Sequence, residues 1–385
     1  MTGDFERLGV FLEPRPQSPS LTNCHSSFSL KFTLLPESCD LSLPKISSIA
    51  MRITVFGATG NQGGSVARSL LQNPTFQVRG ISRDPGSDAS KKLAEQGAEV
   101  VQANGFDFDQ MVAAFQDSWG AFVNINSDDE VFQNNDGPTE FDMGKIIVDA
   151  AVKAGVQCFV FSSGPPCTEM TNGEVEMKAM DMKYKVEQYA RSSEAFQTFI
   201  PIGAGWFLEN FLGKEVAPVF GGFPHFMDSE GYFTFRVPNW GGDGYVPWLS
   251  ISDDFGDIVH GIYLDPVRWN GKFVHGVSDI RTFEDIMIDF NFATGSRARF
   301  DPILPDWKSF DSYGIHQLED VKLMFGLAQI TGGRYFEEFA EIETAFILKQ
   351  ATAEALGWPQ KKHYLVTTTE WFDAQFGSAG CSKTL

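Results

Sequence analysis

Residues 52–63 read RITVFGATGNQG, a short apolar run that ends in a glycine-rich loop. The run at 52–56 is rich in β-branched and aromatic residues, which predicts a buried parallel strand. After the loop, residues 65–71 (SVARSLL) place their apolar side chains on one face of a helix that Pro74 ends. A strand, a glycine loop and a helix in this order form the context that a dinucleotide-binding fingerprint requires.

Each of three glycines in this loop has a physical role in such a site. Gly57 makes the tight turn, Gly60 lets the backbone approach a pyrophosphate, and Gly63 lets the helix pack closely on the strand. The start of the helix presents free N–H groups and a partial positive charge to the phosphates. The alternative is a glycine-rich turn that binds nothing, which this context disfavours.

The end of the second strand indicates which dinucleotide is bound. Residues 76–82 (FQVRGIS) form this strand, and Arg83 follows it. An acidic residue here would bind the ribose 2′-hydroxyl of NAD, whereas an arginine accommodates the 2′-phosphate of NADP. Arg83 therefore favours NADP, while the adjacent Asp84 leaves open both the use of NAD and a plain surface ion pair between the two side chains.

Strands and helices alternate through the next hundred residues, which predicts an α/β fold with a doubly wound parallel (Rossmann) sheet. Further strands are expected at 98–102, 121–125 and 158–161, and helices at 91–96, 108–115 and 144–153. Ligands bind such sheets at the carboxyl ends of the strands. The residues expected around that crevice are Gly60, Arg83, Asn104, Asn126 and Ser162.

The pattern along the chain also predicts a division into domains. Residues 1–50 have scattered prolines and serines without a helical or strand period, so we expect a disordered extension, although Met51 could equally start the protein. The predicted NADP-binding domain covers 51–204, with a returning segment near 249–278. Residues 205–248 and 279–385 are predicted to form a smaller α+β domain that binds the substrate or a partner.

The segment 206–248 is crowded with aromatic residues and punctuated by glycines. One interpretation is an apolar pocket for an aromatic or polyketide-like substrate. The other is the core of a small, loop-rich domain, and it is slightly favoured because aromatic residues are normal in protein cores.

The composition excludes several classes of function. A net charge of −20 without a basic run disfavours direct binding of nucleic acid, so a regulator would act through a protein partner. No stretch is long and apolar enough to cross a bilayer. The five cysteines and six histidines lack metal-ligand spacing, so no metal is predicted. Reduced cysteines and no signal peptide predict a cytoplasmic protein, or a nuclear one if it is a regulator.

From about residue 51 to the region of Trp371, the chain resembles the NmrA-like family, an atypical branch of the short-chain dehydrogenases/reductases. The stretch VFGATGNQGGSVAR at 55–68 carries most of this resemblance. The supporting motifs are SRDP at 82–85, QGAEVVQ at 96–102, Lys183 with VEQY at 186–189, ENF at 209–211, VPW at 246–248 and SD at 252–253. The family contains redox-sensing regulators and oxidoreductases, many of the latter in fungal secondary metabolism.

The resemblance implies roles for individual residues. The residues that it places on the pyrophosphate are Gly57, Thr59, Gly60, Asn61 and Gln62. It places Arg83 on the 2′-phosphate and Lys183 on the nicotinamide ribose. Two segments depart from the family pattern. Ala103-Asn104 replaces Gly-Asp but keeps an amide for adenine, and GAG at 203–205 replaces Arg-Pro-Gly beside the nicotinamide.

Typical reductases of the wider superfamily use a tyrosine as general acid and a lysine four residues later. Lys183 is present here, but Ala179 stands where that tyrosine would be. Lys183 and Ser162 are our catalytic candidates; the alternatives are a plain surface lysine and a simple strand-end hydroxyl.

These observations predict an NADP-dependent oxidoreductase that acts on a small organic carbonyl or alkene. The alternative, which Ala179 motivates, is a non-catalytic NADP(H) redox sensor that co-regulates transcription through a protein partner.

Overall fold

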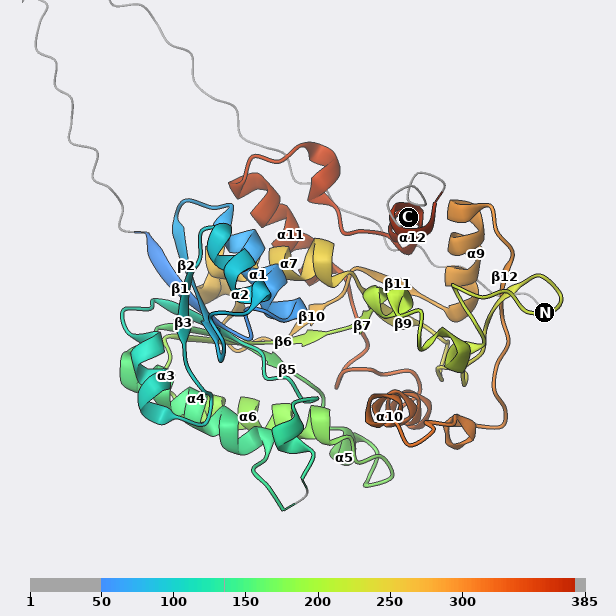
Figure 1. Ribbon diagram of the computed structural model, residues 1–385, viewed down its shortest axis with the longest axis horizontal. Coiled ribbons are helices and arrows are strands. Elements are labelled where there is room, and N and C mark those ends of the chain that lie inside the picture. Colours follow the sequence, from blue (N-terminus) through green and yellow to red (C-terminus); the bar gives the residue numbers. More distant parts are fainter. Residues whose placement is uncertain (1–49, 135, 378–385) are drawn as a thin grey trace, which may run out of the picture. The chain divides into compact units, whose positions relative to one another are not determined.

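The computed structural model describes residues 50–134 and 136–377, and these belong to one structural unit (Figure 1). The predicted disordered extension at residues 1–50 lies outside the described part of the chain, except for Ala50.

Seven strands form the central sheet in the order β10-β6-β5-β4-β1-β2-β3 (Figure 1). Every pairing in it is parallel, which confirms the predicted doubly wound sheet. The strands are β1 (Met51–Phe56), β2 (Phe76–Ser82), β3 (Glu99–Gln102), β4 (Gly120–Val123), β5 (Cys158–Ser163), β6 (Thr198–Ala204) and β10 (Val274–Gly276). The strand order reverses between β1 and β4, and ligands of such sheets bind at the carboxyl ends of the strands beside that point.

Helices cover both faces of this sheet (Figure 1). On one face lie α1 (Asn61–Leu71), α2 (Asp88–Glu95), α7 (Gly256–Leu264) and α11 (Glu343–Ala355). On the other lie α3 (Phe108–Phe115), α4 (Glu140–Ala154) and α6 (Lys178–Ser192). The strand β5 is buried along its whole length because both of its faces are covered, which explains its run of apolar residues.

Helix α11 comes late in the sequence and yet packs on α7, in the helical layer that covers one face of the central sheet. Ala345 and Leu348 belong to the same core cluster as Ile258 and Val259 of α7. A Cβ atom on Gly261 would come within 2.3 Å of the Leu348 carbonyl oxygen, so glycine is needed for this close helix contact. The predicted assignment of 279–385 to a second domain stays a prediction, but this helix completes the core around α1 and α7.

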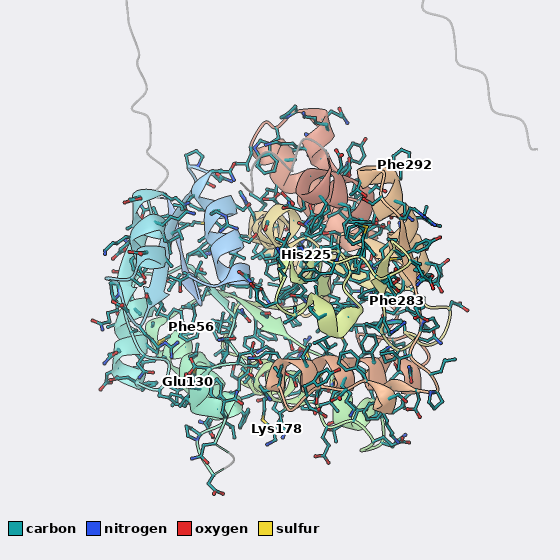
Figure 2. The ribbon with its side chains drawn as sticks, turned by 45° about the vertical axis from the view of Figure 1, so that its right-hand side comes forward. Phe56, Glu130, Lys178, His225, Phe283 and Phe292 are labelled. Atoms are coloured by element: carbon teal, nitrogen blue, oxygen red, sulfur yellow. The ribbon has the colours of Figure 1, made fainter. Side chains whose placement is uncertain are left out.

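Most of the remaining elements surround a second core that is rich in aromatic residues. These elements are β7 (Trp206–Phe207), β8 (Phe233–Phe235), β9 (Val246–Leu249), β11 (Asp279–Arg281), β12 (Ala298–Phe300), α9 (Phe283–Thr294), α10 (His316–Ile330) and α12 (Thr368–Phe376). Two short helices lie elsewhere: α5 (Cys167–Met170) packs against α6, and α8 (Pro266–Trp269) packs against α7 and β6. Trp206 stacks on Trp248 with ring centroids 5.0 Å apart, and side chains crowd the region around Phe283 (Figure 2). Most aromatic residues of 206–248 are therefore core residues, as the second interpretation of this segment expected.

None of the helices in the described ranges has the length and apolar character that crossing a membrane demands.

Candidate functional site

The glycine loop adopts the geometry expected of a dinucleotide-binding turn. Gly57 has a φ of +78°, and a Cβ atom there would lie 2.7 Å from the Asn124 carbonyl oxygen. A Cβ atom on Gly63 would lie 2.3 Å from the Gly57 carbonyl oxygen. The fold itself therefore requires these two glycines, and the helix that follows begins at Asn61, four residues before the predicted start.

Gly60 is different, because the fold does not require it. Its φ of −85° suits any residue, and an added Cβ atom would meet only the Gly57 carbonyl oxygen, at 3.4 Å. A glycine at a position where the fold would accept a side chain is consistent with close approach of a ligand to the backbone.

A cavity of about 670 Å³ lies at the carboxyl ends of the strands and contains most of the predicted site. The predicted residues that line it are Gly57, Thr59, Gly60, Asn61, Gln62, Arg83, Asn104, Asn126 and Lys183. Ala179, where superfamily members carry the tyrosine, also lines it. At the opposite end the same cavity reaches the aromatic core at Trp206 and Tyr335.

Two predicted residues do not line the cavity. Gly63 packs under the loop, as described above. Ser162 is 1% exposed, and its hydroxyl donates to Gln62 Oε1 over 2.7 Å. This contact holds the Gln62 side chain, which does line the cavity, so the geometry gives Ser162 a positioning contact while its catalytic role stays a prediction.

Lys183 is buried, so its interpretation as a plain surface lysine is wrong. Its Nζ donates to the Ile125 carbonyl oxygen over 2.7 Å and to Ser127 Oγ over 2.8 Å. It also forms an ion pair with Glu140, which is itself buried near the start of α4. The lysine therefore ties α6 and α4 to the segment that follows β4.

Arg83 pairs with a residue that the sequence did not suggest. Its guanidinium lies 2.7 Å from Asp129 Oδ2. The neighbouring Asp84 instead accepts a hydrogen bond from the Gly86 backbone N–H. The predicted alternative of a surface pair with Asp84 is therefore wrong, because the arginine points across the cavity mouth.

The cavity also contains an acid that sequence reasoning missed, Asp320 on α10. Its carboxylate has no hydrogen-bond partner among the described residues. Burial raises the pKa of Asp320 to about 6; the charge of His316 opposes this rise and that of Asp128 adds to it. Ligand atoms of Asp128, His316 and Asp320 lie within 4.8 Å of one another. No motif could have found this residue, since it is distant in sequence from the glycine loop and from Lys183.

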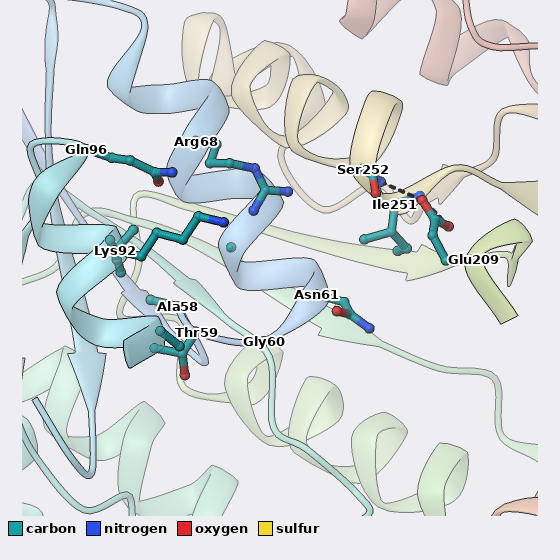
Figure 3. Close-up of a pocket in the computed structure, with 13 residues that line it drawn as sticks. Ala58, Thr59, Gly60, Asn61, Arg68, Lys92, Gln96, Glu209, Ile251 and Ser252 are labelled. Carbon is teal, nitrogen blue, oxygen red and sulfur yellow. Dashed lines mark hydrogen bonds between the residues drawn. The ribbon is translucent and has the colours of Figure 1, made fainter. Parts of the chain in front are cut away.

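A second cavity of about 380 Å³ lies on the other side of the glycine loop (Figure 3). Thr59, Gly60 and Asn61 line both cavities. Here they meet two basic side chains, Arg68 of α1 and Lys92 of α2. The loop is thus accessible from two sides.

Comparisons with known proteins agree with this architecture. The model of the NmrA-like family matches residues 50–358. An NmrA-like family domain-containing oxidoreductase of Aspergillus flavus, lnaB, is 68% identical over 327 residues, which cover 85% of this chain and 98% of the relative. The similarly named FrzB of a Cladobotryum species is 59% identical over 330 residues, covering 85% of this chain and 98% of that relative.

Solved structures show the same fold at low sequence identity. NmrA, a negative transcriptional regulator crystallised with NADP, aligns with a TM-score of 0.62 at 20% identity and covers 87% of this chain and 98% of its own. The NADPH-dependent quinone oxidoreductase QOR2 of Escherichia coli, complexed with NADPH, aligns with a TM-score of 0.59 at 19% identity, over 84% of this chain and 100% of its own. On the family match and the identity to these relatives, the chain belongs to the NmrA-like family.

Proposed function

We propose that this chain is an oxidoreductase that binds NADP(H), with NAD as a weaker alternative, and reduces a small organic carbonyl or alkene. The observation that carries the proposal is the single cavity that joins the glycine loop and Arg83 to an aromatic end at Trp206 and Tyr335. Relatives covered almost end to end by this chain are named oxidoreductases, which supports the same conclusion.

The residues present suit a dinucleotide. Gly60 leaves room for a pyrophosphate over the start of α1, and Arg83 offers a guanidinium to a 2′-phosphate. Asn104 offers an amide beside the adenine end. When bound, the nicotinamide supplies the hydride for the reduction.

Reduction of a carbonyl also needs a proton at the oxygen, and Ala179 cannot supply it. Asp320 is suited to this task, because its carboxyl lines the cavity and its raised pKa of about 6 keeps it protonated at mildly acidic pH and in a fraction of the molecules near neutral pH. Lys183 is already bonded to three protein groups, so we assign it to positioning the segment after β4. The aromatic end suits an aromatic or secondary-metabolite substrate.

Stopped-flow absorbance tests the proposal. The full chain loaded with NADPH is mixed with a panel of quinones, ketones and enones, and loss of the near-ultraviolet absorbance of the reduced nicotinamide is recorded. We expect substrate-dependent oxidation by at least one aromatic compound. No oxidation across the panel would contradict catalysis.

The second candidate is a redox sensor that acts through a protein partner, in the cytoplasm or the nucleus. Ala179 favours it, because the usual proton donor is missing while the cavity for the dinucleotide is kept. Pull-downs with and without NADPH test it, and identical partners under both conditions would remove its basis.

A further inference from the structure

The Arg83–Asp129 ion pair spans the mouth of the dinucleotide cavity. Arg83 follows β2 and Asp129 follows β4, and these strands lie on either side of β1 in the sheet. Both side chains line the cavity, and the guanidinium lies 2.7 Å from the Asp129 carboxylate. The pair therefore connects the two walls between which the adenine half of a dinucleotide would lie.

The two partners are not equally fixed. Asp129 has only 14% of its side chain exposed, and its other carboxylate oxygen accepts a hydrogen bond from the Val131 N–H at the start of the 3-10 turn Glu130–Phe132. Arg83 has 70% of its side chain exposed. The acid is held by its own turn, whereas the arginine is free to change partner.

The charges around the cavity make this pairing consequential. Among the described lining residues, the basic side chains are Arg83 and Lys183, and Lys183 is bound to the buried Glu140. The acidic lining residues are Asp128, Asp129 and Asp320. A phosphate that enters this cavity thus finds one accessible cation, and that cation already has a carboxylate partner.

We propose that Asp129 is a specificity-determining residue that lowers the preference for NADP over NAD. The Asp129 carboxylate is paired with the guanidinium that the 2′-phosphate would bind. NADP must therefore displace the carboxylate, whereas NAD, which lacks this phosphate, leaves the ion pair intact. An ion pair whose arginine is mostly exposed is weak enough for a phosphate to displace. The inference rests on the proposed function, because it assumes that this cavity binds nicotinamide dinucleotides.

Calorimetric titration of the full chain with NADP⁺ and NAD⁺ tests this role in Asp129→Asn. The amide can still accept from the Val131 N–H but cannot pair with Arg83 as an anion. We expect the Kd for NADP⁺ to fall about 3- to 5-fold, the upper end of the scale of a weak ion pair, and the Kd for NAD⁺ to change less than about twofold.

Two further variants isolate the ion pair from general electrostatics. Asp128→Asn removes the same charge from the neighbouring lining residue, which forms no ion pair with Arg83, and should change the NADP⁺ to NAD⁺ ratio less than about twofold. In an Arg83→Ala background, Asp129→Asn should leave the ratio of the Kd values for NADP⁺ and NAD⁺ unchanged.

Three results would overturn the inference. One is an unchanged cofactor ratio in Asp129→Asn, and another is an equal change in Asp128→Asn. The third is a ratio that responds to Lys92→Ala instead, which would place the 2′-phosphate in the second cavity. Wild-type protein that bound neither dinucleotide would contradict the proposed function itself, and this inference with it.

Discussion

At the scale of single residues, Arg83 is expected to decide how tightly the 2′-phosphate is held. Arg83→Ala should weaken NADP⁺ binding by about 1.5–3 kcal/mol, the value of a charge-assisted hydrogen bond, and NAD⁺ binding much less. Calorimetry on both cofactors measures the difference. Lys91→Ala removes a charge from an exposed side chain of α2 that lines neither cavity, and it is the control that should affect the binding of neither cofactor. Equal losses for the two cofactors would mean that Arg83 does not contact the phosphate.

Asp320 is expected to act as the proton donor in the reduction. Asp320→Asn should lower kcat about 100-fold or more while leaving NADPH binding unchanged, since an amide cannot transfer the proton. Its neighbour Glu319 is half-buried and does not line the cavity, and Glu319→Gln is the control that should retain activity.

The pH dependence of the reduction provides a second measurement of Asp320. Its pKa is raised to about 6, and reduction uses the protonated carboxyl, so kcat should fall as the pH rises through that value. The Asn variant should lose this dependence. An unchanged kcat and pH profile in the variant would exclude Asp320 as the donor.

At the scale of secondary-structure elements, the glycine loop separates the demands of folding from those of binding. Gly60→Ala should leave the free energy of unfolding within about 0.5 kcal/mol of wild type, because its backbone is extended and a Cβ atom fits, but should abolish tight dinucleotide binding. Gly63→Ala should destabilise the protein, because α1 would have to move from the loop. Urea unfolding and calorimetry on both variants measure this. Wild-type affinity in Gly60→Ala would show that no pyrophosphate approaches the loop.

Lys183 joins α6 to α4 and to the segment after β4, so its removal should lower the free energy of unfolding. Lys183→Ala leaves Glu140 buried without its partner, which typically costs about 3–5 kcal/mol. Lys185 is exposed on the same helix, and Lys185→Ala should change stability by less than about 0.5 kcal/mol. Urea unfolding distinguishes the two, and equal stability of both variants would show that the buried pair contributes little.

At the scale of the whole molecule, local sequence patterns predicted the strands and helices, and the family resemblance predicted most of the residues proposed to bind the dinucleotide. The loop at 57–63 and Arg83 could be placed because strand, turn and helix signals are read within a few residues of each other. Asp129 and Asp320 could not be placed in the site from the sequence, because their positions at the cavity depend on the strand order of the sheet and on the packing of the second core. Side-chain partners of that kind are a property of tertiary packing alone.

Helix α11 has a consequence for how the protein is made. Gly261 allows α11 to pack closely on one face of α7, and this face is covered only after residues 343–355 have been synthesised. During synthesis, the nucleotide-binding part of the chain therefore emerges before the helix that covers it, with the face of α7 around Gly261 still exposed to water. We therefore expect a chain truncated before α11 to expose this face of α7 and to be a substrate for chaperones and proteases.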